Sequence, residues 1–222
     1  LITGASGYIA WNIIGKLAQS ECSIICLSRN IKKIDKQNGK GNIKIVEGSY
    51  QKQEIYEKVL QNIDIIYHLA SQTSIYKAES DSLADYKANV LPMQILLEVC
   101  RLNKTCPIVI FSGTSTQCGL VEKLPVDETV VDDPITTYDF NKLQAERWLR
   151  YYTRQGWVKG VSLRLTNVYG PGPKSSSSDR GILNLMINKA LQGDELTIYG
   201  TGEHIRDYVY IDDVVSAFLS VP

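Results

Sequence analysis

The 222-residue sequence lacks an excess of either charge, and it lacks a hydrophobic run long enough to cross a membrane. Lysine plus arginine number 24 and aspartate plus glutamate also number 24, so the formal net charge is zero. Nucleic acids and anionic membranes favour a basic partner, so we expect neither to bind this chain. A membrane-spanning helix needs about 20 apolar residues. The longest apolar runs, 22–27 and 63–70, have only the length of strands.

Histidines and closely paired cysteines are also scarce. The chain has two histidines and five cysteines, and it contains no CxxC pair. Because zinc sites usually combine such residues at short spacings, we expect no metal site. An odd number of cysteines in a chain of this size favours reduced thiols and therefore a cytoplasmic protein. The chain opens inside a predicted strand rather than at a methionine, so we expect the whole protein to be longer.

Short apolar runs alternate with helical patterns along most of the chain. The predicted strands are residues 1–3, 23–28, 43–47, 63–69, 108–112, 160–165, 196–199 and 207–211. The predicted helices are residues 8–19, 54–60, 81–103, 137–155, 182–192 and 212–219, the last with Asp212 as its N-cap. Apolar strands separated by helices predict a parallel sheet covered on both faces. The fold class is therefore α/β, a doubly wound Rossmann fold.

A glycine-rich segment, TGASGYIA at residues 3–10, joins the first predicted strand to the first predicted helix. Gly4 permits a tight turn, Gly7 lets the backbone approach a pyrophosphate, and Ala10 lets the helix pack closely on the strand. The helix N-terminus points free N–H groups and a partial positive charge at the phosphates. A strand before the segment and a helix after it predict a dinucleotide site.

The end of the second predicted strand distinguishes NAD from NADP. An acidic residue at this point would bind the adenosine ribose of NAD, but the chain has Ser28 and Arg29. A hydroxyl and a guanidinium suit a 2′-phosphate, so we expect NADP in preference to NAD. In the alternative, NAD binds and Arg29 stacks on the adenine or faces water.

Tyr138 and Lys142 are four residues apart in a predicted helix and therefore lie on one face of it. A tyrosine phenol has a pKa of about 10 and is a poor base at neutral pH, but a lysine ammonium one turn away favours the phenolate. Such a pair can relay protons between a hydroxyl and a carbonyl. It opens the helix after the fifth strand, where the crevice of a doubly wound sheet is expected. Thr114, just after that strand, places a hydroxyl near the same point.

The chain resembles an extended short-chain dehydrogenase/reductase of the NAD(P)-dependent nucleotide-sugar epimerase/dehydratase family. The resemblance covers essentially the whole chain and rests on motifs that occur in family order. These are TGASGYIA at 3–10, HLAS at 68–71, Asn89 with Val90, Thr114, Tyr138 with Lys142, RLTNVYGP at 164–171 and RDYVYIDDV at 206–214.

The resemblance implies a cofactor site and a domain division. The implied contacts of the pyrophosphate are Gly4, Ser6, Gly7, Tyr8 and Ile9, and those of the nicotinamide side are Leu69, Ala70 and Ser71. We expect residues 1–166 to form the dinucleotide-binding domain and 167–206 to form part of a substrate-binding lobe. Residues 207–222 would return to the first domain, in a chain that is shorter than a typical member.

The resemblance also implies catalytic and substrate-binding roles. Thr114 would orient the substrate oxygen, with Ser115 as the second choice and a further substrate contact. Tyr138 would be the acid/base, and Lys142 would hold the nicotinamide ribose. Asn167 and Arg206 match positions that contact the diphosphate of a nucleotide sugar.

Three departures from the family pattern narrow the function. Ser49 follows Gly48 where the family usually carries an aspartate that contacts adenine, and no acid follows the second strand. Ser115 and Thr116 stand where 4,6-dehydratases carry Asp-Glu, which disfavours a dehydratase.

We expect a 4-epimerase of a nucleotide sugar, with an NADP-dependent reductase of a nucleotide 4-keto-sugar as the alternative. A non-catalytic cofactor-binding regulator is a third possibility. The helices predicted at 81–103 and 137–155 resemble those that pair across a twofold axis in the family, so we expect a homodimer. The side chains expected on that apolar surface are Leu91, Leu97, Trp148, Leu149 and Tyr152.

Overall fold

A computed structural model describes residues 1–30, 34, 42–173, 182–198, 200–203 and 205–222. Its strands are β1 Ile2–Thr3, β2 Ser23–Ser28, β3 Asn42–Glu47, β4 Ile65–His68, β5 Ile108–Thr114, β6 Lys159–Leu165, β7 Asn167–Tyr169 and β8 Tyr208–Tyr210. Its helices are α1 Tyr8–Leu17, α2 Gln53–Val59, α3 Ile75–Ser80, α4 Ser82–Asn89, α5 Leu91–Leu102, α6 Thr137–Arg154, α7 Ile182–Gln192 and α8 Ile211–Ser220, with a 3₁₀ turn, η2, at Ser115–Cys118.

Six strands form one sheet in the order β3-β2-β1-β4-β5-β6, and every neighbouring pair is parallel. This order reverses direction between β1 and β4, as it does in a doubly wound dinucleotide-binding sheet. The predicted fold class is therefore confirmed. The crevice for a ligand is expected beyond the carboxyl ends of β1 and β4.

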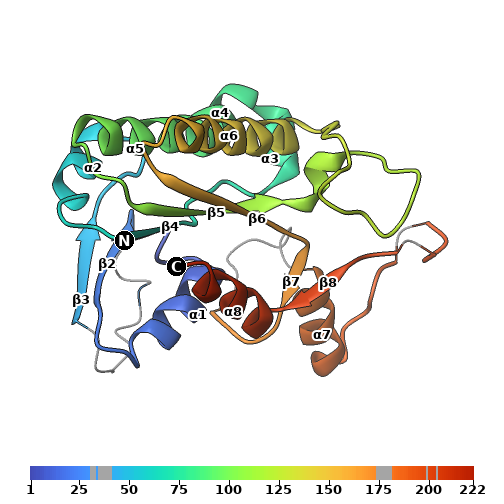
Figure 1. Ribbon diagram of the computed structural model, residues 1–222. Helices are drawn as coiled ribbons and strands as arrows, with labels where there is room; N and C mark the ends of the chain where they lie inside the picture. The colour runs from blue at the N-terminus through green and yellow to red at the C-terminus, as the bar shows by residue number, and fades with distance from the viewer. Residues whose placement is uncertain (31–33, 35–41, 174–181, 199, 204) are drawn as a thin grey trace.

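Helices cover both faces of the sheet (Figure 1). Helices α2, α5 and α6 bury one apolar cluster with the sheet, while α1 and α8 bury a second on the opposite face. Side chains that alternate between the two faces of β5 contribute to both clusters: Val109 and Phe111 belong to the first and Ile110 to the second. Successive side chains of a strand point to opposite faces, so a continuously apolar strand serves two cores.

The helix predicted at 81–103 is two helices, because the chain breaks at Val90 between α4 and α5. Pro92 lies in the first turn of α5, where its missing N–H costs no helical hydrogen bond. Helix α3 and turn η2 were not predicted.

Three further differences lie near the C-terminal end. The strand predicted at 196–199 is wrong, since residues 196–198 form neither strand nor helix and 199 lies outside the described residues. Tyr210, not Asp212, is the N-cap of α8; Asp212 lies in its first turn, where a carboxylate faces the positive helix end. Strand β7 was not predicted, and it pairs in parallel with β8 as a second, two-stranded sheet.

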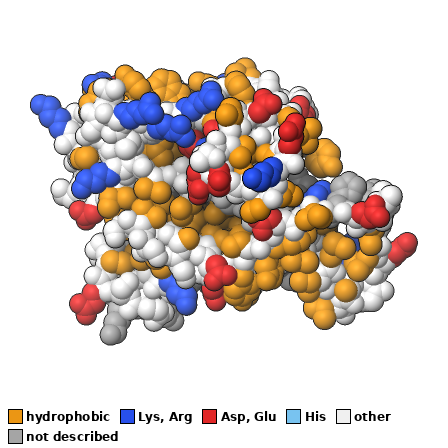
Figure 2. Space-filling model, turned by 45° about the vertical axis from the view of Figure 1, so that its right-hand side comes forward, with side chains coloured by type: hydrophobic (Ala, Val, Ile, Leu, Met, Phe, Trp, Pro, Cys, Tyr) orange, Lys and Arg blue, Asp and Glu red, His pale blue; other side chains and the backbone are white. Residues whose placement is uncertain are grey.

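The expected apolar surface on the paired helices is partly wrong. Leu97, Leu149 and Tyr152 are buried in the core of this chain, where they pack toward the sheet. Exposed apolar side chains also gather around α7, which has no buried residue, and β8 (Figure 2). Among the described residues, no helix is long and apolar enough to span a membrane.

Candidate active site

The glycine-rich turn after β1 touches the end of β4. Thr3 pairs with His68 in the sheet, so both strands end at the same level. Gly4 has φ +67°, and a Cβ there would lie 2.7 Å from the Cα of Ala70. Only glycine fits this conformation and this approach. The turn therefore brings the segment expected at the pyrophosphate against the segment expected at the nicotinamide.

The N-terminus of α1 carries no side-chain cap among the described residues. Gly7 is its N-cap, no acidic residue occupies the first turn, and no side chain accepts from its N–H groups. Uncapped N–H groups and the helix dipole suit a phosphate. Tyr8 and Ile9 begin the helix, and the Tyr8 ring lies against Gly172, where a Cβ would be 2.5 Å from Cε2.

The end of β2 is tied to the same turn. The buried Ser28 hydroxyl donates to Ser6 Oγ at 3.0 Å and accepts from the Asn30 N–H at 3.2 Å. Arg29 is exposed, with its guanidinium carbon 5.2 Å from the centroid of the Tyr50 ring. Ser28 is thus engaged in local hydrogen bonds, and Arg29 beside it is an exposed cation.

Helix α6 begins where Thr136 caps it, because the Thr136 hydroxyl accepts from the Asp139 N–H at 3.1 Å. This start places the half-buried Tyr138 in the first turn and Lys142 one turn later. The Lys142 ammonium is 4.1 Å from the centroid of the Phe111 ring, and the residue is only 2% exposed.

Burial lowers the pKa of Lys142 to about 7, and the carboxylates of Asp85 and Glu146 oppose that shift. Burial therefore weakens, in the ligand-free chain, the positive charge that the sequence predicts beside Tyr138. His68 lies behind Phe111 and is also buried; burial and the Lys142 charge lower the pKa of its imidazole to about 3, so it is neutral.

A buried carboxylate, Asp85, connects α6 to the chain that follows β4. Asp85 accepts from the side-chain amides of Gln72 at 2.9 Å, Asn89 at 2.9 Å and Asn141 at 2.8 Å. Asn89 Oδ1 in turn accepts from the Ser71 hydroxyl at 2.7 Å. The sequence analysis did not identify Asp85 and Asn141 as residues near the site, although it singled out Asn89, which is bonded to Asp85.

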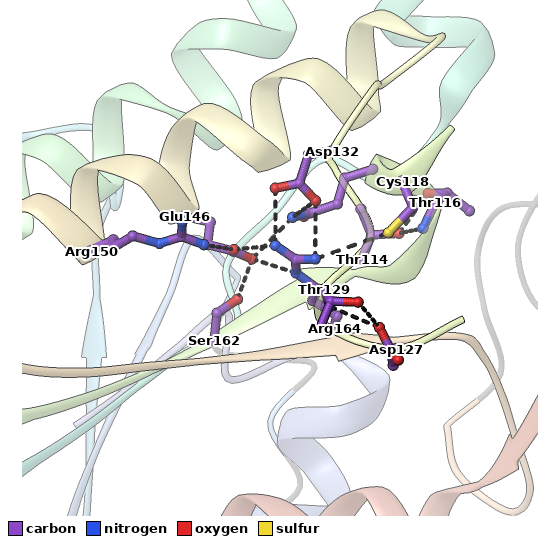
Figure 3. A network of polar contacts seen from close by, with 11 residues as sticks. Thr114, Thr116, Cys118, Asp127, Thr129, Asp132, Glu146, Arg150, Ser162 and Arg164 are labelled. Atoms are coloured by element: carbon purple, nitrogen blue, oxygen red, sulfur yellow. Dashed lines mark hydrogen bonds and ion pairs between the residues drawn. The ribbon is translucent and has the colours of Figure 1, made fainter. Parts of the chain in front are cut away.

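Thr114 ends β5 with its hydroxyl 2.7 Å from that of Thr116 (Figure 3). Thr116 donates to the Asp139 carboxylate on α6. Ser115, the second choice for Thr114, begins turn η2. The structure thus brings Thr114 to the N-terminal turn of the helix that carries Tyr138.

The arginine of the RLTNVYGP motif fixes the loop between β5 and α6 (Figure 3). Arg164 lies 2.7 Å from a Glu146 carboxylate oxygen and 3.0 Å from one of Asp132. Glu146 also accepts from the Ser162 hydroxyl at 2.8 Å. These contacts lower the pKa of the Glu146 carboxyl against the opposing effect of its burial.

The two residues expected at the substrate diphosphate lie on the small sheet. Asn167 begins β7, and both its N–H and its side-chain amide donate to the Asp207 carbonyl, at 3.2 Å and 3.0 Å. Arg206 precedes β8, is exposed, and donates to the Ile205 carbonyl at 2.8 Å. They are neighbours, and the Arg206 charge faces outward. In the described ranges, no group of three or more His, Cys, Asp or Glu residues could hold a metal ion.

The fold and the site define a dinucleotide-dependent enzyme of the short-chain dehydrogenase/reductase type. The model of the NAD dependent epimerase/dehydratase family matches residues 1–221, and the chain belongs to that family.

Its relatives are nucleotide-sugar enzymes. A putative UDP-glucose 4-epimerase of Methanocaldococcus jannaschii is 28% identical over 220 residues, which cover 99% of this chain and 72% of the relative. A dTDP-4-dehydro-6-deoxyglucose reductase of Escherichia coli is 27% identical, with 99% and 71% covered. The crystal structure of a UDP-glucose 4-epimerase from Thermotoga maritima with UDP-glucose has a TM-score of 0.89 at 29% identity, and the match covers 98% of this chain and 71% of that one.

Proposed function

We propose that this protein is a 4-epimerase of a nucleotide sugar that works with bound NAD. The observation that carries the proposal is that the first turns of α6, with Tyr138 and Lys142, lie at the carboxyl end of β5. Thr114 is linked through Thr116 to Asp139 beside Tyr138, and Lys142 lies over Phe111, whose partner in the sheet, His68, pairs with Thr3 before the Gly4 turn. The residues fit a dinucleotide: the turn admits no side chain at Gly4, and the α1 N-terminus is uncapped. The 4-epimerases among the relatives support the assignment.

In this mechanism Tyr138 takes the proton of the hydroxyl at carbon 4 and later returns it. When bound, NAD supplies the reversible acceptor for the hydrogen on that carbon. Lys142 would hold the nicotinamide ribose, and its charge would favour the Tyr138 phenolate. Thr114 holds the reacting oxygen. The keto-sugar then rotates in the site, and its carbon 4 is reduced on the opposite face.

The diphosphate of the substrate is assigned to Asn167 and Arg206, because the outward guanidinium of Arg206 can grip it with two hydrogen bonds. Residues 167–206 would then belong to a substrate-binding lobe between two parts of a dinucleotide-binding domain, 1–166 and 207–222. The packing of α8 with α1 in one apolar cluster supports the return of the chain to the first domain, while the small sheet joins β7 of the lobe to β8 of the returning segment.

A second candidate is an NADP-dependent reductase of a nucleotide 4-keto-sugar. Arg29 favours it, since this exposed cation at the end of β2 suits a 2′-phosphate. The reductase from Escherichia coli among the relatives adds support. The dehydratase alternative stays disfavoured, because Ser115 and Thr116 replace the acidic pair.

The assembly is proposed to be a cytoplasmic homodimer that pairs through α4 and α6. An open groove of about 590 Å³ lies between these helices, and Leu83 and Phe140 in its lining are exposed. Apolar surface of this kind suits a partner subunit. Light scattering that finds a monomer at every concentration would count against the dimer.

Denaturing the purified protein and identifying the released nucleotide tests the cofactor. Retained NAD, together with conversion of UDP-glucose to UDP-galactose without net cofactor reduction, supports the epimerase. Protein that is isolated empty and consumes NADPH with a nucleotide 4-keto-sugar supports the reductase. Tyr138→Phe is the matched control, because it should bind the cofactor and fail in either reaction.

A further inference from the structure

Three hydroxyls and one carboxylate form a chain at the candidate site. Thr114 Oγ1 and Thr116 Oγ1 are 2.7 Å apart, and Thr116 donates to Asp139 Oδ1. The second carboxylate oxygen, Asp139 Oδ2, accepts from the Thr136 hydroxyl at 2.6 Å. Asp139 is 2% exposed, so these hydroxyls stand in place of water around its carboxylate.

The proton count gives this chain a direction. A threonine hydroxyl has one proton, and a carboxylate only accepts. Thr116 gives its proton to Asp139, so the proton between Thr114 and Thr116 belongs to Thr114. The Thr116 N–H also points to Thr114 Oγ1, at 3.4 Å. What Thr114 can offer to a ligand is therefore a lone pair and not a proton.

Helix capping accounts for only one side of Asp139. The exchange of hydrogen bonds with Thr136 closes the first turn of α6, as an acidic residue at the third helical position commonly does. The contact of Oδ1 with Thr116 contributes nothing to that cap, since Thr116 belongs to turn η2. This contact joins Asp139 to turn η2, which follows β5 directly after Thr114.

We propose that Thr116 and Asp139 are positioning residues that make Thr114 a hydrogen-bond acceptor, so that it holds the sugar hydroxyl and not the ketone. A hydroxyl can donate to the Thr114 lone pair, whereas a ketone has no proton to donate. The hydroxyl proton reaches Tyr138 after rotation about its C–O bond. Once the ketone forms, its contact with Thr114 is lost and the sugar is free to turn over. The inference rests on the proposed epimerase function.

The test compares two ligands that differ only at carbon 4, UDP-6-deoxyglucose and UDP-4-keto-6-deoxyglucose. Calorimetry on the holoenzyme measures the hydroxyl sugar with NADH and the ketone with NAD, so neither pair can react. In Asp139→Asn, the amide can donate to Thr116 and reverse the chain, which frees the Thr114 proton for a ketone. The ratio of the two dissociation constants should move toward the ketone by roughly three- to tenfold, the effect of one hydrogen bond.

Thr116→Val should shift the ratio in the same direction, because Thr114 then loses the acceptor of its proton. Thr116→Ser keeps the hydroxyl and should restore the wild-type ratio. The double variant Thr116→Val with Asp139→Asn should shift no further than either single variant, since the two residues act in series. Thr129→Val, which removes an exposed hydroxyl bonded to Asp127, is the matched control and should change nothing.

Three results would overturn the inference. An unchanged ratio in Thr116→Val and Asp139→Asn, with both sugars still bound, refutes the role of Thr114 as acceptor and leaves the proposed function standing. Failure of the wild-type holoenzyme to bind either sugar refutes the proposed function together with the inference. Additive shifts in the double variant show that the residues act separately, which also contradicts the chain.

Discussion

Replacing Lys142 with methionine is expected to make the ligand-free protein more stable near neutral pH. Methionine keeps most of the length of the side chain and its contact with Phe111, and it removes a cation from a site that is 2% exposed. The same variant should bind NAD more weakly and lose turnover, because the proposed ribose contact and the charge beside Tyr138 are gone. Stability and activity should therefore move in opposite directions.

The magnitude follows from proton linkage. A lysine has an ordinary pKa of 10.5, and burial lowers the pKa of Lys142 to about 7. Each pKa unit between the folded and unfolded states changes the unfolding free energy by about 1.4 kcal/mol. Burial of the charged form therefore costs on the order of 5 kcal/mol below pH 7.

The direction in which stability changes with pH depends on whether the folded or the unfolded chain binds the Lys142 proton more tightly. Between pH 7 and 10.5 the unfolded chain keeps the Lys142 proton and the folded chain releases it, so this group makes the folded state more stable as pH rises. Methionine does not titrate. The gain in unfolding free energy from Lys142→Met should therefore be largest below pH 7. It should shrink by up to about 1.4 kcal/mol for each pH unit above pH 7.

Urea unfolding of both proteins at several pH values from 6 to 9.5, followed by tryptophan fluorescence after cofactor removal, measures this difference. Lys58→Met on α2 is the control, because Lys58 is exposed and its replacement should give a difference that does not depend on pH. A pH-independent difference for Lys142→Met, or a variant that is less stable at every pH, would refute the argument that Lys142 is buried at a cost.

Three further predictions concern the acid/base residue, the choice of cofactor and the stability of the first turn. Tyr138→Phe should lower turnover by on the order of 10²–10⁴ while NAD still binds; steady-state assays with near-native turnover would move the acid/base role to another group. Arg29→Ala should weaken NADPH binding by about 1–3 kcal/mol and leave NADH nearly unchanged; equal losses in a titration would show that Arg29 contacts a part both cofactors share. Gly4→Ala should destabilise the protein by about 2–4 kcal/mol through positive φ and backbone collision. Gly156→Ala, at φ +74° with nothing within 4 Å of a Cβ, should cost only about 1 kcal/mol; urea unfolding measures both glycine variants.

The fold and the cofactor turn were predictable because their signals are local. Each central strand is a short run that is apolar throughout, which only a sheet with two covered faces explains. The first glycine of the turn is fixed by conformation, since Gly4 has φ +67°. Tyr138 and Lys142 were predicted to share one helix face because about four residues make one helical turn, and both lie in α6. None of these inferences needs knowledge of which distant segments meet.

The features that were missed depend on distant contacts. Asp139 reads as an ordinary helix-capping acid in the sequence, and its bond to Thr116 joins residues 23 positions apart. The Asp85 network spans 56 positions to Asn141. Leu97 and Leu149 were assigned to a subunit surface because helical periodicity identifies an apolar face without saying what covers it. In this chain that face covers the sheet.

The position of Lys142 is where folding and function conflict most clearly. It is buried against Phe111, a member of the apolar cluster that α5 and α6 form on the sheet, and the charges of Asp85 and Glu146 only partly offset the burial of its own charge. A methionine or leucine would give a more stable core at this point, and natural sequences depart from the most stable choice chiefly where activity requires it. From the buried cation beside Phe111 we propose, independently of any motif, that the first turns of α6 belong to a functional site. A ligand that offers hydroxyl oxygens to the ammonium, as a nicotinamide ribose does, would raise the pKa of Lys142 again and recover part of the stability that the ligand-free chain lacks.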